Sequence, residues 1–144
     1  MVKKTHAAAA FKDSSFSRKL RIRKAEDFRR VYAEQCRAGN GAIRVLAAEN
    51  GLEHSRLGLS VSRRVGSACF RNRWKRILRE VFRLTRAELP GGIDFVVIPL
   101  DGTEPDFHSI RQELPRLARL AVKRLRDPDL RRSPRAVQKR NFRK

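Results

Sequence analysis

Basic side chains recur through residues 71–80, RNRWKRILRE, at the spacing of an α-helix. A helix turns by about 100° per residue, so Trp74, Ile77 and Leu78 share one face with Val81 and Leu84. An apolar face predicts packing on a core, and an opposite face of one charge sign favours a bound polyanion. Guanidinium groups suit phosphate, because they donate paired hydrogen bonds and also stack on bases. The predicted polar face consists of Asn72, Lys75, Arg76, Arg79, Arg83 and Arg86.

The same basic face could instead serve only solubility. A face of that kind usually mixes charge signs, because like charges four residues apart repel by about 0.2 to 0.5 kcal/mol per pair. Glu80 is the only acid between residues 71 and 86, where it could pair with Arg76. Asn72 either caps the start of the helix or reaches a ribose hydroxyl or a base edge. The nearly unmixed sign favours polyanion binding.

The overall composition indicates the same kind of partner. The chain has 144 residues, and 35 Lys and Arg against 15 Asp and Glu give a net charge of +20. Such an excess suggests a polyanion, because self-repulsion disfavours the compact state. The chain has two cysteines, Cys36 and Cys69, which are far apart and lack the spacing of a metal site. We therefore expect free thiols in a reducing cytoplasm. The longest apolar run, FVVIPL, is strand-sized, so we expect neither a membrane span nor a membrane partner.

Catalysis by the protein's own side chains finds no support in the sequence. His6, His54 and His108 have no partner at a spacing typical of metal or triad chemistry, and all three are predicted at the surface. The chain contains no phosphate-binding loop, no HExxH motif and no dense acidic cluster. We therefore predict no catalytic residue, no metal ligand and no small-molecule substrate.

Hydrophobic periodicity divides the chain into elements in the order α-β-β-α-β-α. Strands are predicted at 42–49 and 56–62, paired as an antiparallel hairpin, and at 93–100, where the unbroken apolar run indicates burial on both faces. Pro115 either kinks the last helix or marks its start. This order predicts an α+β fold, an α/β sandwich with one open sheet face. Helices are predicted at 24–36, 66–88 and 110–125.

The chain is predicted to form one domain between two basic ends. Residues 1–19 and 127–144 are rich in Lys and Arg and carry little to bury, which is typical of flexible arms. Between them no internal repeat and no second compositional unit is evident, so we expect a single domain that binds the polyanion at 20–126.

The segment SVSRRVGSACFRNRWKRILREVFR, residues 60–83, resembles the signature of the protein subunit of bacterial ribonuclease P. The resemblance extends over AEDFRRVY before it and GGIDFVVIP after it, and covers neither tail. The sequence departs from the family pattern at Arg63, where Lys is usual, at Cys69, where an aliphatic residue is common, and at Tyr32, where Phe is common. The positions that match the signature are Gly66, Ala68, Arg71, Asn72, Arg73, Lys75, Arg76, Arg79 and Glu80.

The resemblance implies a ribosomal-protein-like domain with a left-handed βαβ crossover through the long basic helix. It also implies two RNA-binding surfaces. A cleft between the first helix and the sheet would receive the single-stranded 5′ leader of precursor tRNA, with Phe28 and Tyr32 as its aromatics. Two aromatics at helical spacing could equally be core residues. The implied contacts to the ribonuclease P RNA are Arg63, Arg64, Arg71, Asn72, Arg73, Lys75, Arg76 and Arg79.

The activity implied by the resemblance is endonucleolytic 5′ maturation of tRNA by a ribonucleoprotein. The RNA subunit would hold Mg²⁺ and carry the catalysis, and the protein alone would bind no cofactor. Two other classes stay open on composition: a structural, ribosomal-type RNA-binding protein without a processing role, and a basic DNA-binding regulator. The regulator is disfavoured, since no helix-turn-helix pair and no dimerisation heptads are evident.

Overall fold

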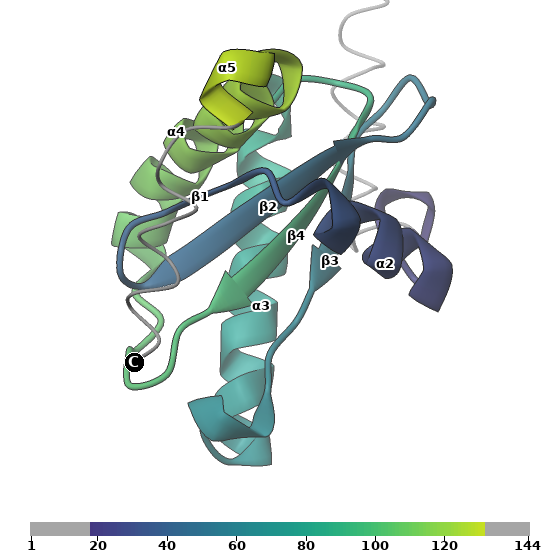
Figure 1. Cartoon of the computed structure of the whole chain (residues 1–144). Coiled ribbons are helices and arrows are strands. Elements are labelled where there is room, and N and C mark those ends of the chain that lie inside the picture. The colour runs from purple at the N-terminus through teal and green to yellow at the C-terminus, as the bar shows by residue number, and fades with distance from the viewer. Residues whose placement is uncertain (1–17, 132–144) are drawn as a thin grey trace, which may run out of the picture.

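One four-stranded sheet organises the protein, and helices cover both of its faces (Figure 1). The computed structural model describes residues 18–131. The strands are β1 (Arg37–Gly39), β2 (Ile43–Glu49), β3 (Arg56–Leu59) and β4 (Ile93–Pro99). The α-helices are α2 (Ala25–Glu34), α3 (Ala68–Thr85), α4 (Phe107–Arg126) and α5 (Pro128–Arg131). Short 3₁₀ turns are η2 (Arg18–Leu20), η3 (Arg63–Val65) and η4 (Arg86–Glu88).

The strand order is β1-β2-β4-β3, which corrects the predicted hairpin. Strand β4 lies between β2 and β3, antiparallel to the first and parallel to the second. Its apolar run is almost wholly buried, as predicted, and a strand buried on both faces belongs in the middle of a sheet. The predicted pairing of 42–49 with 56–62 is therefore wrong, because β4 takes the position between them. Strand β1 was missed, since three residues are too few to show alternation.

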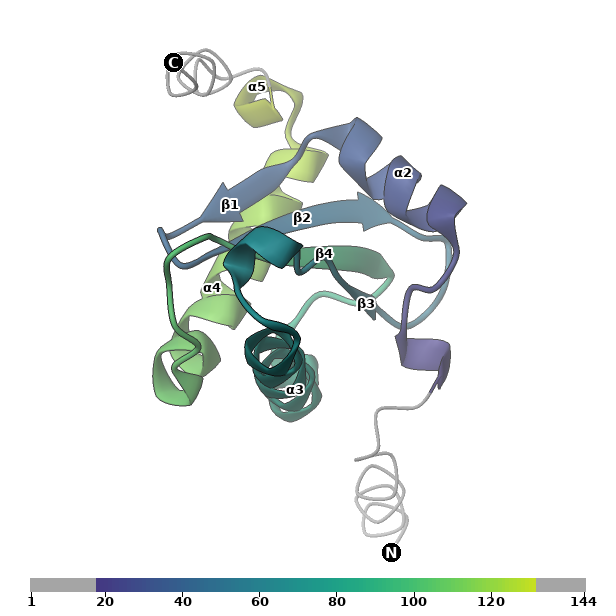
Figure 2. The same ribbon diagram turned by 90° about the horizontal axis from the view of Figure 1, so that it is seen from below.

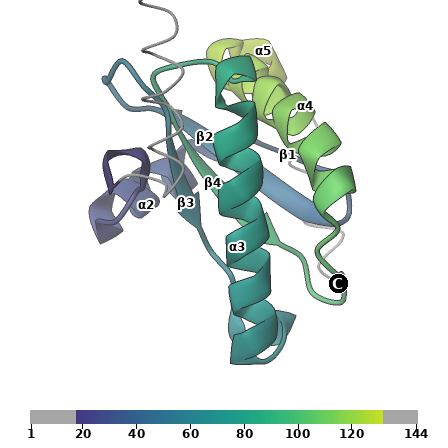
Figure 3. The same ribbon diagram turned by 180° about the vertical axis from the view of Figure 1, so that it is seen from behind.

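The connection from β3 through α3 to β4 is a left-handed crossover, as the family resemblance implied and against the usual handedness. Seen from the helix side in Figure 3, α3 passes in front of the sheet with β3 on the left and β4 on the right. Both strands run downward in this view, which fixes the hand. The long basic helix α3 thus connects the parallel neighbours β3 and β4.

The two faces of the sheet bury cores of different size. Helices α3 and α4 cover one face, and α2 crosses part of the other (Figure 2). The larger cluster includes Trp74, Phe82 and Phe95, and the smaller one lies under α2 around Val31, Leu46 and Val96. Alternation along the strands produces this division, because successive side chains point to opposite faces. The face expected to be open therefore carries α2 over part of its area.

Helix α3 is amphipathic as predicted, with one error in the apolar face. Ser67 caps its start by accepting a hydrogen bond from the backbone N–H of Phe70, at 3.2 Å. Leu84 was placed on the buried face, yet it is 41% exposed. Phe82 and Thr85 are buried instead, because the 3.6-residue period carries the buried stripe from Val81 to these positions.

The remaining boundaries settle smaller points. Pro115 lies inside α4 and is buried, so it does not mark the start of that helix. Helix α2 ends before Gln35, which adopts a left-handed conformation and donates its N–H to the carbonyl of Tyr32. Within residues 18–131 no helix is both long and apolar enough to cross a membrane. Most of the predicted arms, 1–19 and 127–144, falls outside the described residues, and those predictions stay open.

Candidate nucleic-acid interface

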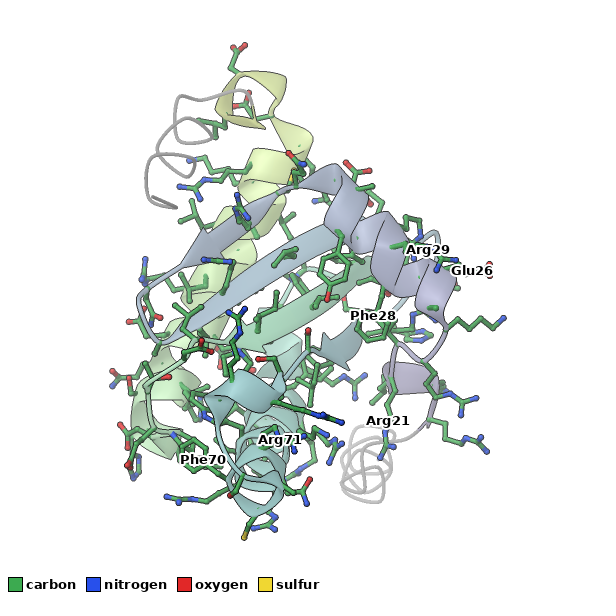
Figure 4. The ribbon with its side chains drawn as sticks, turned by 60° about the horizontal axis from the view of Figure 1, so that its bottom comes forward. Arg21, Glu26, Phe28, Arg29, Phe70 and Arg71 are labelled. Atoms are coloured by element: carbon green, nitrogen blue, oxygen red, sulfur yellow. The ribbon has the colours of Figure 1, made fainter. Side chains whose placement is uncertain are left out.

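The predicted basic residues lie on two consecutive elements, η3 and the first three turns of α3. Arg63 and Arg64 are exposed in η3. Figure 4 shows Arg71 and Phe70 at the start of α3. On α3, the exposed members are Asn72, Arg73 and Arg76, and the half-buried ones are Arg71, Lys75 and Arg79. The structure thus places all eight predicted residues on these two consecutive elements, and we call this set the η3–α3 basic surface.

Most of this surface carries charge that no acid neutralises. Among residues 18–131, the side chains of Arg63, Lys75 and Arg76 make no ion pair and no hydrogen bond. Arg64 approaches the carboxylate of Asp101 at 4.0 Å, and both side chains are largely exposed. Exposed pairs of this kind contribute about 0 to 1 kcal/mol. The surface is therefore available to a polyanion at little cost.

Two contacts position individual side chains at the start of α3. Arg71 donates from Nε to the carbonyl of Gly66, at 3.2 Å, which folds its side chain back over the preceding turn. The guanidinium carbon of Arg73 lies 6.0 Å from the centre of the Phe70 ring, within the range of a cation–π contact. These contacts orient two arginines without neutralising them.

The expected pairing of Glu80 with Arg76 is wrong. Glu80 instead accepts two hydrogen bonds from Arg83, with a shortest distance of 2.5 Å. A glutamate that precedes its cationic partner along a helix is the favoured orientation, which explains the choice. The bonds to Glu80 raise the pKa of Arg83. Arg76 consequently has no ion pair within the described residues.

Helix α2 carries the two predicted aromatics on the other face of the sheet. Their ring centres are 6.5 Å apart with the planes tilted by 32°. Phe28 is half-buried against the smaller core, and a Cβ added at Gly58 would lie 2.9 Å from two of its ring atoms. Tyr32 is 39% exposed. Phe28, labelled in Figure 4, thus packs on the core and is only half-buried, whereas Tyr32 is exposed.

The strand surface next to these aromatics combines apolar and basic side chains. Ile98 of β4 is half-buried and packs against the cluster that includes Phe28. Its register partner on β2 is Arg44, which is also half-buried. An exposed aromatic near a cation is the arrangement on which single-stranded nucleic acids stack.

Sequence reasoning missed a buried acid that holds α2 on the sheet. Asp94 of β4 is fully buried, with 0% exposure. Its Oδ2 accepts hydrogen bonds from Arg30 of α2 and from Arg56 of β3, both at 2.6 Å. Its Oδ1 accepts from Arg56 Nε at 2.8 Å and from Asn50 at 2.9 Å. We call these residues the Asp94 network.

The network joins helix and sheet at several points. Arg30 also donates to the carbonyl of Glu49 at 2.6 Å, and Asp27 lies 3.4 Å from Arg30 and 3.5 Å from Arg56. Burial by itself would raise the pKa of Asp94, but hydrogen bonds from Arg56, Asn50 and Arg30 outweigh it and lower that pKa. The hydrogen bonds that Arg56 donates to Asp94, together with the negative charges of Asp94 and Asp27, raise the pKa of Arg56 although burial lowers it. A signal existed in the sequence: Asp94 interrupts an otherwise apolar strand.

The other chemical groups are placed separately. Cys36 is buried and Cys69 exposed, and both are free thiols. A ring nitrogen of His54 lies 2.9 Å from the carbonyl of Lys19. His54 is half-buried and His108 is exposed, so only His108 lies fully at the predicted surface. His6 falls outside the described residues. Residues 18–131 contain no group of three His, Cys, Asp or Glu able to hold a metal ion.

Comparison with known proteins gives one consistent family. The model of the family Ribonuclease P matches residues 16–122. The chain is 40% identical over 96 residues to the ribonuclease P protein component of Thermotoga petrophila, covering 67% of this chain and 82% of the relative. It is 45% identical over 85 residues to that of Photobacterium profundum, covering 58% and 71%.

Solved structures agree with this family in fold. The RNase P protein from Thermotoga maritima superposes with a TM-score of 0.63 at 37% identity, over 69% of this chain and 96% of that one. The RNase P protein of Staphylococcus aureus gives a TM-score of 0.63 at 31% identity, over 71% and 94%. The α+β fold with one four-stranded sheet is thus confirmed.

Replacing Asp94 by Asn should destabilise the protein strongly. The substitution leaves the guanidinium groups of Arg30 and Arg56 against a neutral amide, and breaking a buried pair from one side costs about 3 to 5 kcal/mol. Because the folded-state pKa of Asp94 is below its ordinary 3.8, its stabilising effect is complete above that value and lost as the pH falls further. Urea unfolding followed by circular dichroism from pH 7 to pH 2 measures both effects.

The matched control is Asp101→Asn, which removes a carboxylate from the surface. We expect its free energy of unfolding to stay within about 0.5 kcal/mol of wild type at every pH. If Asp94→Asn behaved like this control, the Asp94 network would not hold α2 in place.

Proposed function

The chain belongs to the family of ribonuclease P protein components, and from this membership we propose that it is the protein subunit that assists 5′ maturation of tRNA. In this proposal the chain binds the ribonuclease P RNA and the leader of precursor tRNA, and it does so in the cytoplasm. The observation that carries it is the uncompensated η3–α3 basic surface, which repeats the family's Arg-Asn-Arg pattern at its exposed end.

The η3–α3 basic surface is the proposed dock for the RNA subunit. Arg63, Arg73 and Arg76 are exposed, and they make no ion pair within the described chain. A phosphate backbone that meets such a surface releases its counterions, which drives binding and makes it dependent on salt. Asn72, exposed between Arg71 and Arg73, can bond a ribose hydroxyl or a base edge, so it adds recognition of RNA to simple charge.

The proposed leader site is the α2 side of the sheet, around Phe28 and Tyr32. Stacking on an aromatic ring is worth about 1 to 3 kcal/mol per base and tolerates any base, as leaders of varied sequence require. The 39% exposure of Tyr32 supports this role, since a base can stack only on a side chain that solvent reaches. Arg44 supplies positive charge on the same face.

The chemical step is assigned to the RNA subunit in this proposal. Its Mg²⁺ ions would activate the attacking water, and no side chain of this protein is given a catalytic role. The protein's part is to hold the leader and to reduce phosphate repulsion where two RNAs meet. The enzyme in this sense is the complex, an endoribonuclease to which the protein contributes binding.

Reconstitution tests the proposal directly. The purified protein is mixed with a bacterial ribonuclease P RNA, and 5′ cleavage of precursor tRNA is followed at low Mg²⁺, where the RNA alone is slow. We expect a large stimulation by the complex and no cleavage by the protein alone. Tight RNA binding without stimulation of several such RNAs would instead support a structural RNA-binding protein.

Arg73→Ala and Arg76→Ala should each weaken binding to the ribonuclease P RNA. Each lost phosphate contact lowers the slope of log affinity against log salt by about 1, because fewer counterions are released. Filter binding across a range of KCl concentrations measures the slope. Arg116→Ala on α4 is the control, since Arg116 is exposed and already paired with Glu113. If both variants gave the same salt slope as the control, the η3–α3 basic surface would not be the docking surface for this RNA.

Tyr32→Ala should weaken binding of precursor tRNA to the reconstituted complex and spare mature tRNA. The loss of one stacked base predicts a decrease in affinity of about fivefold or more. Tyr32→Phe keeps the ring and should bind like wild type, which separates stacking from any effect of the hydroxyl. Equal losses for precursor and mature tRNA would contradict the leader role.

A further inference from the structure

Phe70 places an aromatic ring among the cations of the η3–α3 basic surface. It directly precedes Arg71 at the start of α3, where Figure 4 labels both side chains. Phe70 packs against the larger core, but it is only half-buried, whereas Trp74 one turn later has 0% exposure. The ring therefore lies at the border between the core and the basic surface.

The turn before α3 holds this ring in place. A Cβ added at Gly66 would lie 2.6 Å from a ring carbon of Phe70, so the ring occupies the space that any side chain at Gly66 would need. The backbone N–H of Phe70 donates to the hydroxyl of Ser67, and the carbonyl of Gly66 accepts from Arg71. The ring thus has a fixed position in the free protein, which lowers the entropy cost of binding a partner there.

Arg73 lies beside the ring and keeps its charge. Its guanidinium carbon is 6.0 Å from the centre of the Phe70 ring, and Arg73 is exposed, with no ion pair among residues 18–131. A ring and a guanidinium group side by side are two planar groups on which a nucleobase stacks. A phosphate needs only the cation and gains nothing from an apolar ring. The pairing of the two groups therefore favours a base together with its phosphate.

We propose that an unpaired base of the ribonuclease P RNA stacks on Phe70, with Arg73 bound to the same nucleotide. Bases inside an RNA duplex are covered by their neighbours, so a loop, a bulge or an end has to present this base. The occupant is the RNA subunit because Phe70 lies between residues of the surface proposed to dock it, while the proposed leader site around Phe28 lies on the other face of the sheet. This inference rests on the proposed function.

Phe70→Leu tests the stack, because leucine keeps an apolar side chain against the core and removes the aromatic face. We expect the affinity for the ribonuclease P RNA to fall about fivefold or more at a fixed salt concentration. The slope of log affinity against log salt should keep its wild-type value, because a stacked base releases no counterions. Filter binding across a range of KCl concentrations measures both quantities.

Phe107→Leu is the matched control. Phe107 is also half-buried, packs against the same core and begins a helix, α4, but it does not belong to the η3–α3 basic surface. We expect Phe107→Leu to bind the RNA like wild type, and Phe70→Tyr, which keeps the ring, to do the same. Urea unfolding checks that each variant is folded. Phe70→Met takes the place of Phe70→Leu if leucine fails this check, since methionine adapts to irregular gaps in a core.

A fully paired RNA duplex tests the base from the side of the RNA. Wild type and Phe70→Leu should bind this duplex with equal affinity, because it presents no free base face. If Phe70→Leu weakened binding to the duplex as much as to the ribonuclease P RNA, the substitution would damage the whole surface and the inference would be overturned.

The salt slope separates stacking from a role in positioning Arg73. If Phe70→Leu lowered the slope by about 1, as expected for Arg73→Ala, the ring would act only by holding that arginine, and the inference would be overturned. An affinity equal to that of Phe107→Leu would overturn it as well.

These outcomes are distinguishable from a failure of the proposed function. Wild-type protein that binds and stimulates the RNA, with Phe70→Leu equal to the control, overturns the inference and leaves the proposed function standing. Wild-type protein that binds no ribonuclease P RNA overturns both. A loss confined to leader-bearing precursor tRNA would assign the ring to the leader and also overturn the inference.

Discussion

The buried carboxylate of Asp94 is the interaction on which the arrangement of this protein depends. It is fully buried on the central strand, and it accepts hydrogen bonds from one residue of α2, one of β3 and one of the loop after β2. Desolvation of a single carboxylate is expensive, so the site is stable only when its partners are all in place. Helix α2 is thereby held in one orientation on the sheet, and with it the rings of Phe28 and Tyr32.

The high positive charge gives this network a second role. With a net charge of +20, basic side chains repel one another throughout the folded chain. The position of each acid therefore decides which of them are neutralised. Asp94 and Asp27 neutralise Arg30 and Arg56 next to the smaller core, and Glu80 neutralises Arg83 late in α3. No such acid serves Arg63, Lys75 or Arg76 in the described chain. The distribution of acids therefore separates the arginines that hold the fold from the basic residues that we propose to bind RNA.

Much of this could be predicted from the sequence, for reasons that differ between elements. The long periodic helix and the apolar strand at 93–100 give strong local signals, so α3 and the burial of β4 were predicted correctly. Strand order is not a local property: which strand lies between two others depends on tertiary packing, and the hairpin prediction failed there. The Asp94 network joins residues 64 and 38 positions apart, a pairing that no periodicity reveals.

The two surfaces that we propose to bind RNA, the η3–α3 basic surface and the α2 side, are linked through the sheet, although they lie on different faces of it. Strand β4 carries Asp94, which holds α2, and it also completes the crossover that places α3. Strand β3 carries Arg56 of the same network and pairs with β4 along its whole length. The two surfaces that we propose for RNA thus share two adjacent strands as their support. Their relative geometry is therefore set by pairing within the sheet, and a rigid spacing is what one protein needs to contact two RNAs at once.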